Sequence, residues 1–131
     1  MSTTRTITLT GRPSVKISED DWPIVASVSE RDWDGEHRCQ ANITWDWWIM
    51  VRQHTDGRVV VYGGYDFSTE YQGDRDYRAR AGVYLDQPGT ICQAIRDVCR
   101  ELASAESDSD YTARWRTMAA RCIADLPAEE I

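Results

Sequence analysis

The side chains best suited to contact another molecule are Trp, Tyr, Met and Arg residues at alternate positions of predicted strands. These residue types are enriched at protein interfaces, and aromatic rings and guanidinium groups also stack on nucleic-acid bases. The residues that share one predicted sheet face are Trp48, Met50, Arg52, Tyr62, Arg78, Arg80 and Tyr84. This face could bind a protein, a nucleic acid or a second copy of the chain. Alternatively, its arginines pair with Asp46, Asp74 and Asp76 across a solvated sheet.

Acidic side chains at alternate positions form a second candidate surface. The first row comprises Glu30, Asp32, Asp34 and Glu36, and a second row comprises Glu106, Asp108 and Asp110. On a hairpin, the first row would project from one side. A row of carboxylates can imitate phosphates and occupy the groove of a DNA-binding protein. The more common interpretation of such a run is a solvated loop face.

The sequence lacks the motifs that mark common enzymes. It contains no Gly-x-x-x-x-Gly-Lys loop, no Gly-x-Ser-x-Gly elbow and no His-Glu-x-x-His helix motif. The remaining candidate metal ligands are His37, His54, Cys39, Cys92, Cys99 and Cys122. No two cysteines form a Cys-x-x-Cys pair, and structural zinc sites need closely paired ligands. We therefore expect no catalytic residues, no metal and no cofactor.

Charge and composition narrow the function and the compartment. The net charge is −7, from 22 acidic and 15 basic residues, which opposes non-specific binding to nucleic acid. Acidic charge suits a basic partner, or only keeps the protein in solution. Neither a signal peptide nor a membrane-spanning run is visible, and most cysteines fall on or beside helical apolar stripes, as reduced thiols do. We therefore expect a cytoplasmic protein with no membrane contact.

A long β-hairpin, residues 42–65, is expected to position the first candidate surface. Every second residue from Ile43 to Val51 is apolar, which is the period of a strand. A two-residue loop would pair Val51 with Tyr62, whereas a three-residue loop with a left-handed Gly57 pairs Val51 with Val61. We prefer the second register because it places the apolar residues of both strands on one face. The opposite face is half apolar, so another element is expected to cover it.

Two N-terminal segments, residues 6–10 and 14–17, alternate as strands and predict a small hairpin or a flank of the main sheet. Ser18 and the acidic residues after it predict the start of a short helix that could include Trp22, Val25 and Ala26, with Pro23 tolerated only in its first turn.

The segments on either side of the long hairpin are less regular in pattern. Residues 27–33 are ambiguous between helix and strand, and a turn at Asp34 and Gly35 would pair them with 36–41. Residues 66–76 are polar and predict a loop. The residues of segment 77–85 again alternate between two faces, which predicts an antiparallel strand with one face exposed to solvent.

The C-terminal third changes to helical spacing of its apolar residues, at about 90–105 and 109–126. Because only a few residues separate these two segments, the two helices are expected to pack antiparallel as a helical hairpin. Strands within residues 5–85 followed by two helices predict one α+β domain over residues 1–131. Its expected architecture is an antiparallel meander of about four to six strands, with the helical hairpin packed on one face.

Three stretches of the sequence, residues 7–17, 21–26 and 51–58, resemble small proteins carried on proteobacterial plasmids, integrative elements and phages. The resemblance covers about half of the chain and carries no catalytic residues. It implies an accessory protein of a mobile genetic element, such as one that blocks a host defence by CRISPR or restriction.

Two hypotheses for the function follow from these observations. The first is a non-enzymatic module that binds a host protein, such as an inhibitor that occludes a defence protein, through the aromatic and arginine face or the acidic rows. The alternative is a nucleic-acid-binding regulator that uses Arg52, Arg78 and Arg80, whose binding would weaken with salt. A homodimer formed through the same sheet face is a further possibility.

Overall fold

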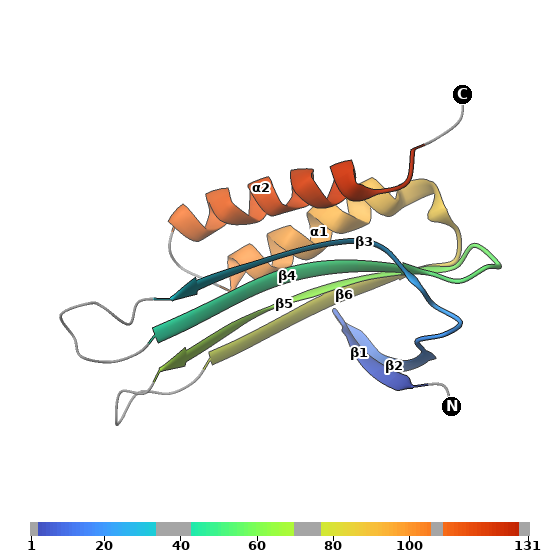
Figure 1. Ribbon diagram of the computed structural model, residues 1–131, viewed down its shortest axis with the longest axis horizontal. Helices are drawn as coiled ribbons and strands as arrows, with labels where there is room; N and C mark the ends of the chain where they lie inside the picture. Colours follow the sequence, from blue (N-terminus) through green and yellow to red (C-terminus); the bar gives the residue numbers. More distant parts are fainter. Residues whose placement is uncertain (1–2, 34–42, 70–76, 106–108, 129–131) are drawn as a thin grey trace.

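The computed structural model describes residues 3–33, 43–69, 77–105 and 109–128 of the 131-residue chain. In chain order its strands and helices are β1 (Thr4–Leu9), β2 (Arg12–Ser18), β3 (Ile24–Trp33), β4 (Ile43–Gln53), β5 (Val59–Thr69), β6 (Tyr77–Leu85), the 3₁₀ turn η1 (Pro88–Thr90), α1 (Ile91–Ser104) and α2 (Ser109–Asp125). All the strand pairs are antiparallel. The expected α+β fold is therefore confirmed (Figure 1).

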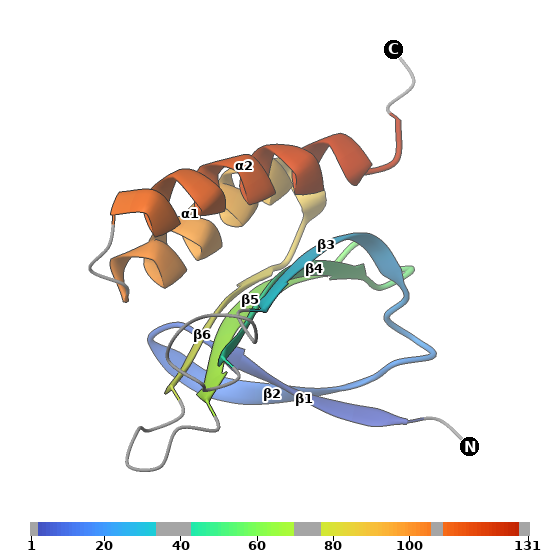
Figure 2. The same cartoon turned by 60° about the vertical axis from the view of Figure 1, so that its left-hand side comes forward.

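The molecule has three layers, with the sheet β3-β4-β5-β6 in the middle. The two helices cover one face of this meander: α1 lies over β5 and β6, and α2 over β3 and β4. The β1–β2 hairpin lies against the other face, where β1 contacts β5 and β6 (Figure 2). The half-apolar face of the central hairpin, which lies away from the helices, is thus partly covered, as expected.

The central hairpin adopts the preferred register. Val51 pairs with Val61, the amide of His54 donates to the carbonyl of Arg58 at 2.9 Å, and Gly57 has a φ of +98°. A positive φ at this position is the left-handed conformation that favours glycine and closes a three-residue loop. The helix-facing side of the hairpin forms the main core, in which Trp47 and Ile49 are fully buried.

A second, smaller core lies between the sheet and the β1–β2 hairpin. Its buried residues are Ile7, Leu9, Ile17, Trp22, Val60 and Tyr62. The amide of Thr10 donates to the Gly82 carbonyl at 2.8 Å, and the Gly82 amide donates to the Thr10 hydroxyl at 3.2 Å. These two bonds fix the tip of the hairpin to strand β6.

The short helix expected after Ser18 is wrong. Strand β2 runs to Ser18, a single turn follows, and β3 begins at Ile24. The turn is held by the amides of Asp21 and Trp22, which both donate to the Ser18 carbonyl. Burial of the Trp22 side chain in the second core and the missing N–H of Pro23 both end the helical pattern after this one turn.

The structure settles one ambiguous segment and corrects the bounds of one predicted loop. Residues 27–33, which were ambiguous between helix and strand, are strand and pair with β4, from Ser27 opposite Met50 to Trp33 opposite Thr44. The expected partner segment 36–41 lies outside the described residues. The segment expected to be a loop begins later than its polarity suggested, because β5 continues to Thr69. Pairing with the long β4 and the strand propensity of Phe67 and Thr69 extend β5 through this segment.

The helical hairpin is close to its predicted bounds. Thr90 occupies the N-cap position of α1, as expected, but its side chain makes no capping hydrogen bond because the 3₁₀ turn η1 precedes it. Cys99 and Cys122 are buried free thiols, as the apolar stripes indicated, and Cys92 is half-buried. Within the part of the chain that the structure describes, no helix is long and apolar enough to cross a membrane.

Alkaline pH is expected to destabilise the protein through the two buried thiols. Burial raises the pKa of Cys99 to about 12 and that of Cys122 to about 11, from an ordinary value of 9.0. The unfolded chain therefore loses these protons first, so this stability is complete below pH 9.0 and declines as the pH rises toward 11. We expect the free energy of unfolding to fall by up to about 1.4 kcal/mol per pH unit for each thiol.

Denaturant titrations between pH 8 and 11, the range that brackets the ordinary pKa and the raised pKa of Cys122, test this expectation. The Cys99→Ala variant should show a shallower pH dependence than the parent. Cys92→Ala, which alters the half-buried thiol, is the matched control. Equal slopes for the parent and Cys99→Ala would contradict the assignment.

Candidate partner-binding surface

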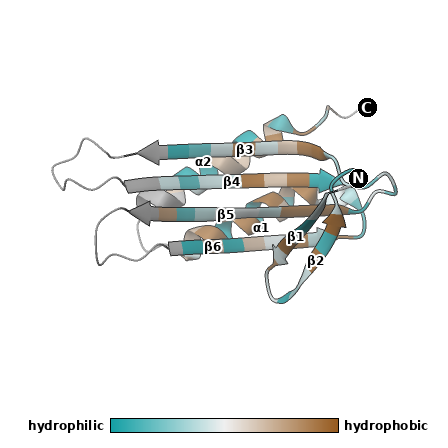
Figure 3. Ribbon diagram, turned by 60° about the horizontal axis from the view of Figure 1, so that its bottom comes forward, coloured by the Kyte–Doolittle hydropathy of each residue, from teal (hydrophilic) through white to brown (hydrophobic). Residues whose placement is uncertain are grey.

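The sheet face opposite the helices is divided by the β1–β2 hairpin into a covered end and an open end (Figure 3). Strand register places matching residues of β3 to β6 in rows across this face. Two rows toward the open end are Arg31, Asp46, Asp66 and Arg78, and, nearer the hairpin, Ser29, Trp48, Gly64 and Arg80. The rows farther along, which contain Met50, Tyr62, Arg52 and Tyr84, approach or lie under the hairpin. We call the side chains of the first two rows the open surface.

The outer row of the open surface has charges in the order basic, acidic, acidic, basic. Arg31 Nε lies 2.7 Å from Asp46 Oδ1, and this hydrogen bond and the nearby charge raise the pKa of Arg31 above its ordinary value. Arg78 Nε lies 3.9 Å from Asp66 Oδ1. Cross-strand ion pairs therefore compensate the two central carboxylates, which face each other across β4 and β5. The side chains of Arg31 and Arg78 remain 73% and 77% exposed.

Trp48 is the central side chain of the open surface. Its half-buried indole meets the Tyr62 ring edge-on at 5.8 Å between centroids, and the Arg80 guanidinium lies 5.3 Å from its ring centre. Arg80 Nη1 is also 2.8 Å from Asp66 Oδ1, so that ion pair holds the guanidinium beside the indole. A Cβ at Gly64 would lie 2.6 Å from the Trp48 ring, so glycine is what allows the indole to lie over β5.

Two shallow hollows flank Trp48. One, of about 390 Å³, lies toward β3 and is bordered by Arg31, Asp46 and Asp66. The other, of about 220 Å³, lies toward β1 and is bordered by Arg5 and Arg80. An indole between two hollows and beside a guanidinium can serve as an anchor in a protein interface, where Trp and Arg dominate binding energies.

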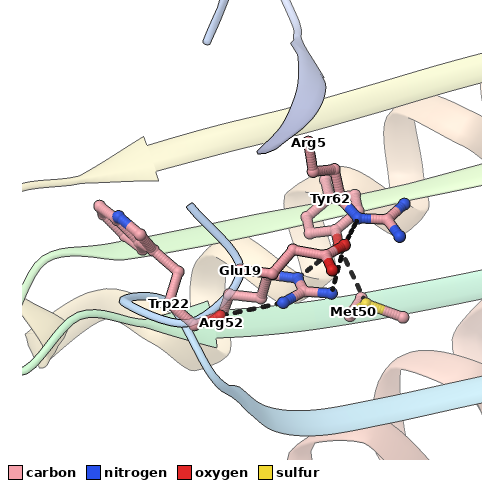
Figure 4. Close-up of polar contacts among 6 residues, drawn as sticks. All are labelled: Arg5, Glu19, Trp22, Met50, Arg52 and Tyr62. Carbon is pink, nitrogen blue, oxygen red and sulfur yellow. Dashed lines mark hydrogen bonds and ion pairs between the residues drawn. The ribbon is translucent and has the colours of Figure 1, made fainter. Parts of the chain in front are cut away.

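Arg52 and Tyr62, two of the predicted surface residues, are instead buried under the hairpin, each with 5% exposure. Arg52 donates from Nε to the Tyr62 hydroxyl at 2.9 Å and from Nη1 to the Trp22 carbonyl at 3.0 Å (Figure 4). Its Nη2 lies 3.7 Å from Glu19, and the Tyr62 hydroxyl donates to the Met50 sulfur at 2.9 Å. The expectation that these two residues contact a partner is therefore not supported by their positions.

Met50 and Tyr84 are half-buried at the edge of the second core. The guanidinium of Arg12 on β2 lies 5.6 Å from the Tyr84 ring centre, so this ring already has a cationic partner within the molecule. Of the seven residues expected on this face, Trp48, Arg78 and Arg80 belong to the open surface. The surface is therefore smaller than the sequence indicated, because a non-local hairpin covers the remainder.

The first acidic row is not an open row of carboxylates where the structure describes it. Glu30 accepts from Arg114 at 2.7 Å and also from Arg121, so it joins β3 to α2. Asp32 belongs to β3 opposite Trp45, while Asp34 and Glu36 lie outside the described residues. The Arg114 guanidinium lies 4.0 Å from the Trp47 ring centre. Glu30 thus anchors α2 to the sheet.

Arg31 and Asp66 belong to the open surface but were not sequence candidates. Arg31 was missed because 27–33 was ambiguous, and Asp66 because it opened a polar segment read as loop. Extending the strand alternation of β5 by one residue past Tyr65 would have placed Asp66 beside Arg78. Of the three expected carboxylate partners of the arginines, Asp46 pairs with Arg31, and Asp74 and Asp76 lie outside the described residues.

The fold and surface define a small α+β protein with a four-stranded meander, two helices on one face and a hairpin that leaves part of the other face open. In the described parts of the chain, no group of three His, Cys, Asp or Glu side chains is placed to hold a metal ion. Comparisons with family models, curated proteins and solved structures find no match.

Proposed function

We propose that this protein is a non-enzymatic binding module that recognises another protein through the open surface. The observation that carries the proposal is the half-buried Trp48, held against Tyr62 and Arg80 between two hollows. Part of this indole is already desolvated and its position is fixed by its neighbours, so a partner can bury it without ordering a flexible side chain. Such pre-organised aromatic anchors account for much of the energy of protein interfaces.

The charge row indicates what the partner presents around this anchor. Arg31 and Arg78 are separated by three strand spacings, or about 14 Å, with Asp46 and Asp66 between them. A complementary surface has carboxylates at the two sides and a basic group at the centre. The same pattern disfavours nucleic acid, because the central carboxylates repel phosphates and the buried Arg52 is not available to bind them.

The order of charges also disfavours a homodimer through this surface. A two-fold axis at the centre of the row would bring basic groups opposite basic groups and acidic groups opposite acidic groups. Like charges placed directly opposite each other are destabilising. We therefore propose a different protein as the partner. Following the resemblance, it is a cytoplasmic host protein, such as a component of a defence system that this chain occludes.

Variants of the open surface are expected to weaken partner binding strongly. Trp48→Ala should reduce the affinity by about thirtyfold, the effect of a typical hot-spot residue. The Arg31→Glu/Arg78→Glu double variant should reduce the affinity by about tenfold or more, because it reverses both outer charges. Lys16→Glu is the control, since it reverses one exposed charge on β2, away from the open surface.

The measurement begins with a pull-down from nuclease-treated host lysate, identification by mass spectrometry and titration of the purified partner. Melting temperatures of the variants establish that each remains folded. A partner that binds all the variants as well as the parent would disprove the proposed surface. A parallel pull-down omits the nuclease. If it recovers nucleic acid alone, and the amount bound falls strongly as the salt concentration rises, the regulator hypothesis is favoured instead.

A further inference from the structure

A groove whose charged lining residues are all basic lies between α1 and α2, on the helical layer of the molecule. Its volume is about 700 Å³. The buried residues that line it are Cys99, Ala103, Trp115 and Ala119, and the exposed residues that line it include Arg96, Arg100 and Arg116. The groove therefore combines an apolar floor with guanidinium groups on both sides.

Helical spacing explains why the groove is hollow and why its sides are basic. Arg96 and Arg100 are four residues apart and share one face of α1, with Ala103 one turn beyond. The larger side chains Ile95, Val98 and Leu102 point into the main core and leave small residues along the junction of the helices. From Arg96 to Ala103 the groove runs for about 12 Å of helix.

The basic charge of the groove is only partly compensated. None of the residues that line it is acidic, in a chain whose net charge is −7. Arg100 Nη1 lies 3.3 Å from Oδ1 of Asp97, an exposed residue one turn earlier on α1. Neither Arg96 nor Arg116 pairs with a carboxylate among the described residues. With respect to the described residues, these two guanidinium groups at the edge of the apolar floor thus keep free hydrogen-bonding capacity.

We propose that this groove binds small amphipathic carboxylates, with the apolar body on the floor and the carboxylate on Arg96 or Arg116. The planar guanidinium matches a carboxylate with two parallel hydrogen bonds. The volume lies within the range of small-molecule sites, which are mainly apolar and carry a few polar groups for orientation. Binding here is separate from the open surface, which lies on the other face of the sheet.

The test is a titration of the full-length protein with decanoate, followed by calorimetry and by amide chemical shifts. Decyltrimethylammonium has an alkyl chain of nearly the same length with a positive head group and is the matched probe. Decanoate should bind and shift amides of α1 and α2, and the cationic probe should bind at least about tenfold more weakly. Equal binding of the two probes, no binding of decanoate, or shifts confined to the sheet would overturn the proposal.

Variants separate the groove from the open surface. Arg96→Glu/Arg116→Glu should weaken decanoate binding by about tenfold or more, and both positions are exposed, so the fold should persist. Ala120→Trp should also weaken it by filling the groove from its edge. Arg78→Glu should leave decanoate binding unchanged. Decanoate binding that is insensitive to both groove variants, or that Arg78→Glu weakens, would also overturn the assignment.

Discussion

The Arg52→Ala variant is expected to unfold with about 3 kcal/mol less free energy than the parent. Arg52 is buried between the sheet and the β1–β2 hairpin, with its charge compensated by Glu19. Breaking a buried, hydrogen-bonded ionic contact by removing one member typically costs about 3–5 kcal/mol. We take the lower value because the Glu19 side chain is 26% exposed and keeps its contact with Arg5 at 2.6 Å.

The loss of stability in Arg52→Ala should concentrate at the β1–β2 hairpin, because the Arg52 side chain links three segments of the chain. It donates to Tyr62 on β5 and to the carbonyl of Trp22 in the turn before β3, and it attracts Glu19 directly after β2. Removing the guanidinium leaves the Trp22 carbonyl and the Glu19 carboxylate without this partner. Hydrogen exchange at the Thr10 amide, which holds the hairpin tip to Gly82, should therefore accelerate more than exchange in the helices.

Guanidinium denaturation with hydrogen exchange on Arg52→Ala, Arg52→Lys and Arg52→Met measures this effect. Arg52→Lys should also be destabilised, since an ammonium cannot reproduce the forked contacts of a guanidinium. Arg52→Met should lose less than Arg52→Ala, because its longer apolar side chain fills the space. It should stay below the parent, because the Trp22 carbonyl and Glu19 still lack their partner. A loss below about 1 kcal/mol in Arg52→Ala, within the range of exposed ion pairs, would show that the network contributes little.

Features that depend on neighbouring residues were predictable from the sequence. The register of the β4–β5 hairpin followed from Gly57 and the alternating apolar residues, and the two helices followed from their apolar stripes. These patterns are local, so the spacing of the apolar residues and the residue type at one turn position are enough to define them. The predicted face was also right, since Trp48, Arg78 and Arg80 share it.

Features that depend on distant packing were not predictable. Alternation placed Arg52 on the face away from the helices but gave no sign that β1 and β2 would cover it. Trp22, which resembled part of a helix start, is buried beneath the hairpin and supplies a carbonyl to Arg52. Contacts between residues 30 positions apart in the chain leave no periodic trace in either segment.

The second large effect is expected at Gly63, since a glycine inside a strand is typical of either a bulge or a close approach of the backbone. Pairing between β4 and β5 continues through both glycines without a register shift, so the close approach is the correct alternative. A Cβ at Gly63 would lie 2.5 Å from the Trp48 carbonyl oxygen and 2.5 Å from Ile49 Cδ1. The Gly63→Ala variant should therefore lose about 3 kcal/mol of unfolding free energy, the upper end for overpacking.

Gly89→Ala is the matched control, because a Cβ there meets nothing within 4 Å. It should be neutral or slightly stabilising, since alanine lowers the entropy of the unfolded chain. Denaturant titrations of both variants give the comparison. Equal stability of Gly63→Ala and Gly89→Ala would mean that the sheet absorbs the extra methyl group without strain.

The Ile49→Val change separates the two contacts of the new methyl group at Gly63. Valine lacks Cδ1, so the Gly63→Ala/Ile49→Val double variant loses the contact with Ile49 and keeps those with the Trp48 carbonyl and, at 3.2 Å, Leu102 Cδ1. The double variant should lose less than the sum of the two single losses, because the removed atom makes room for the added one. Strict additivity would instead place the strain in the backbone contact. In that case, Gly63 is needed for the spacing of β4 and β5 beneath Trp48.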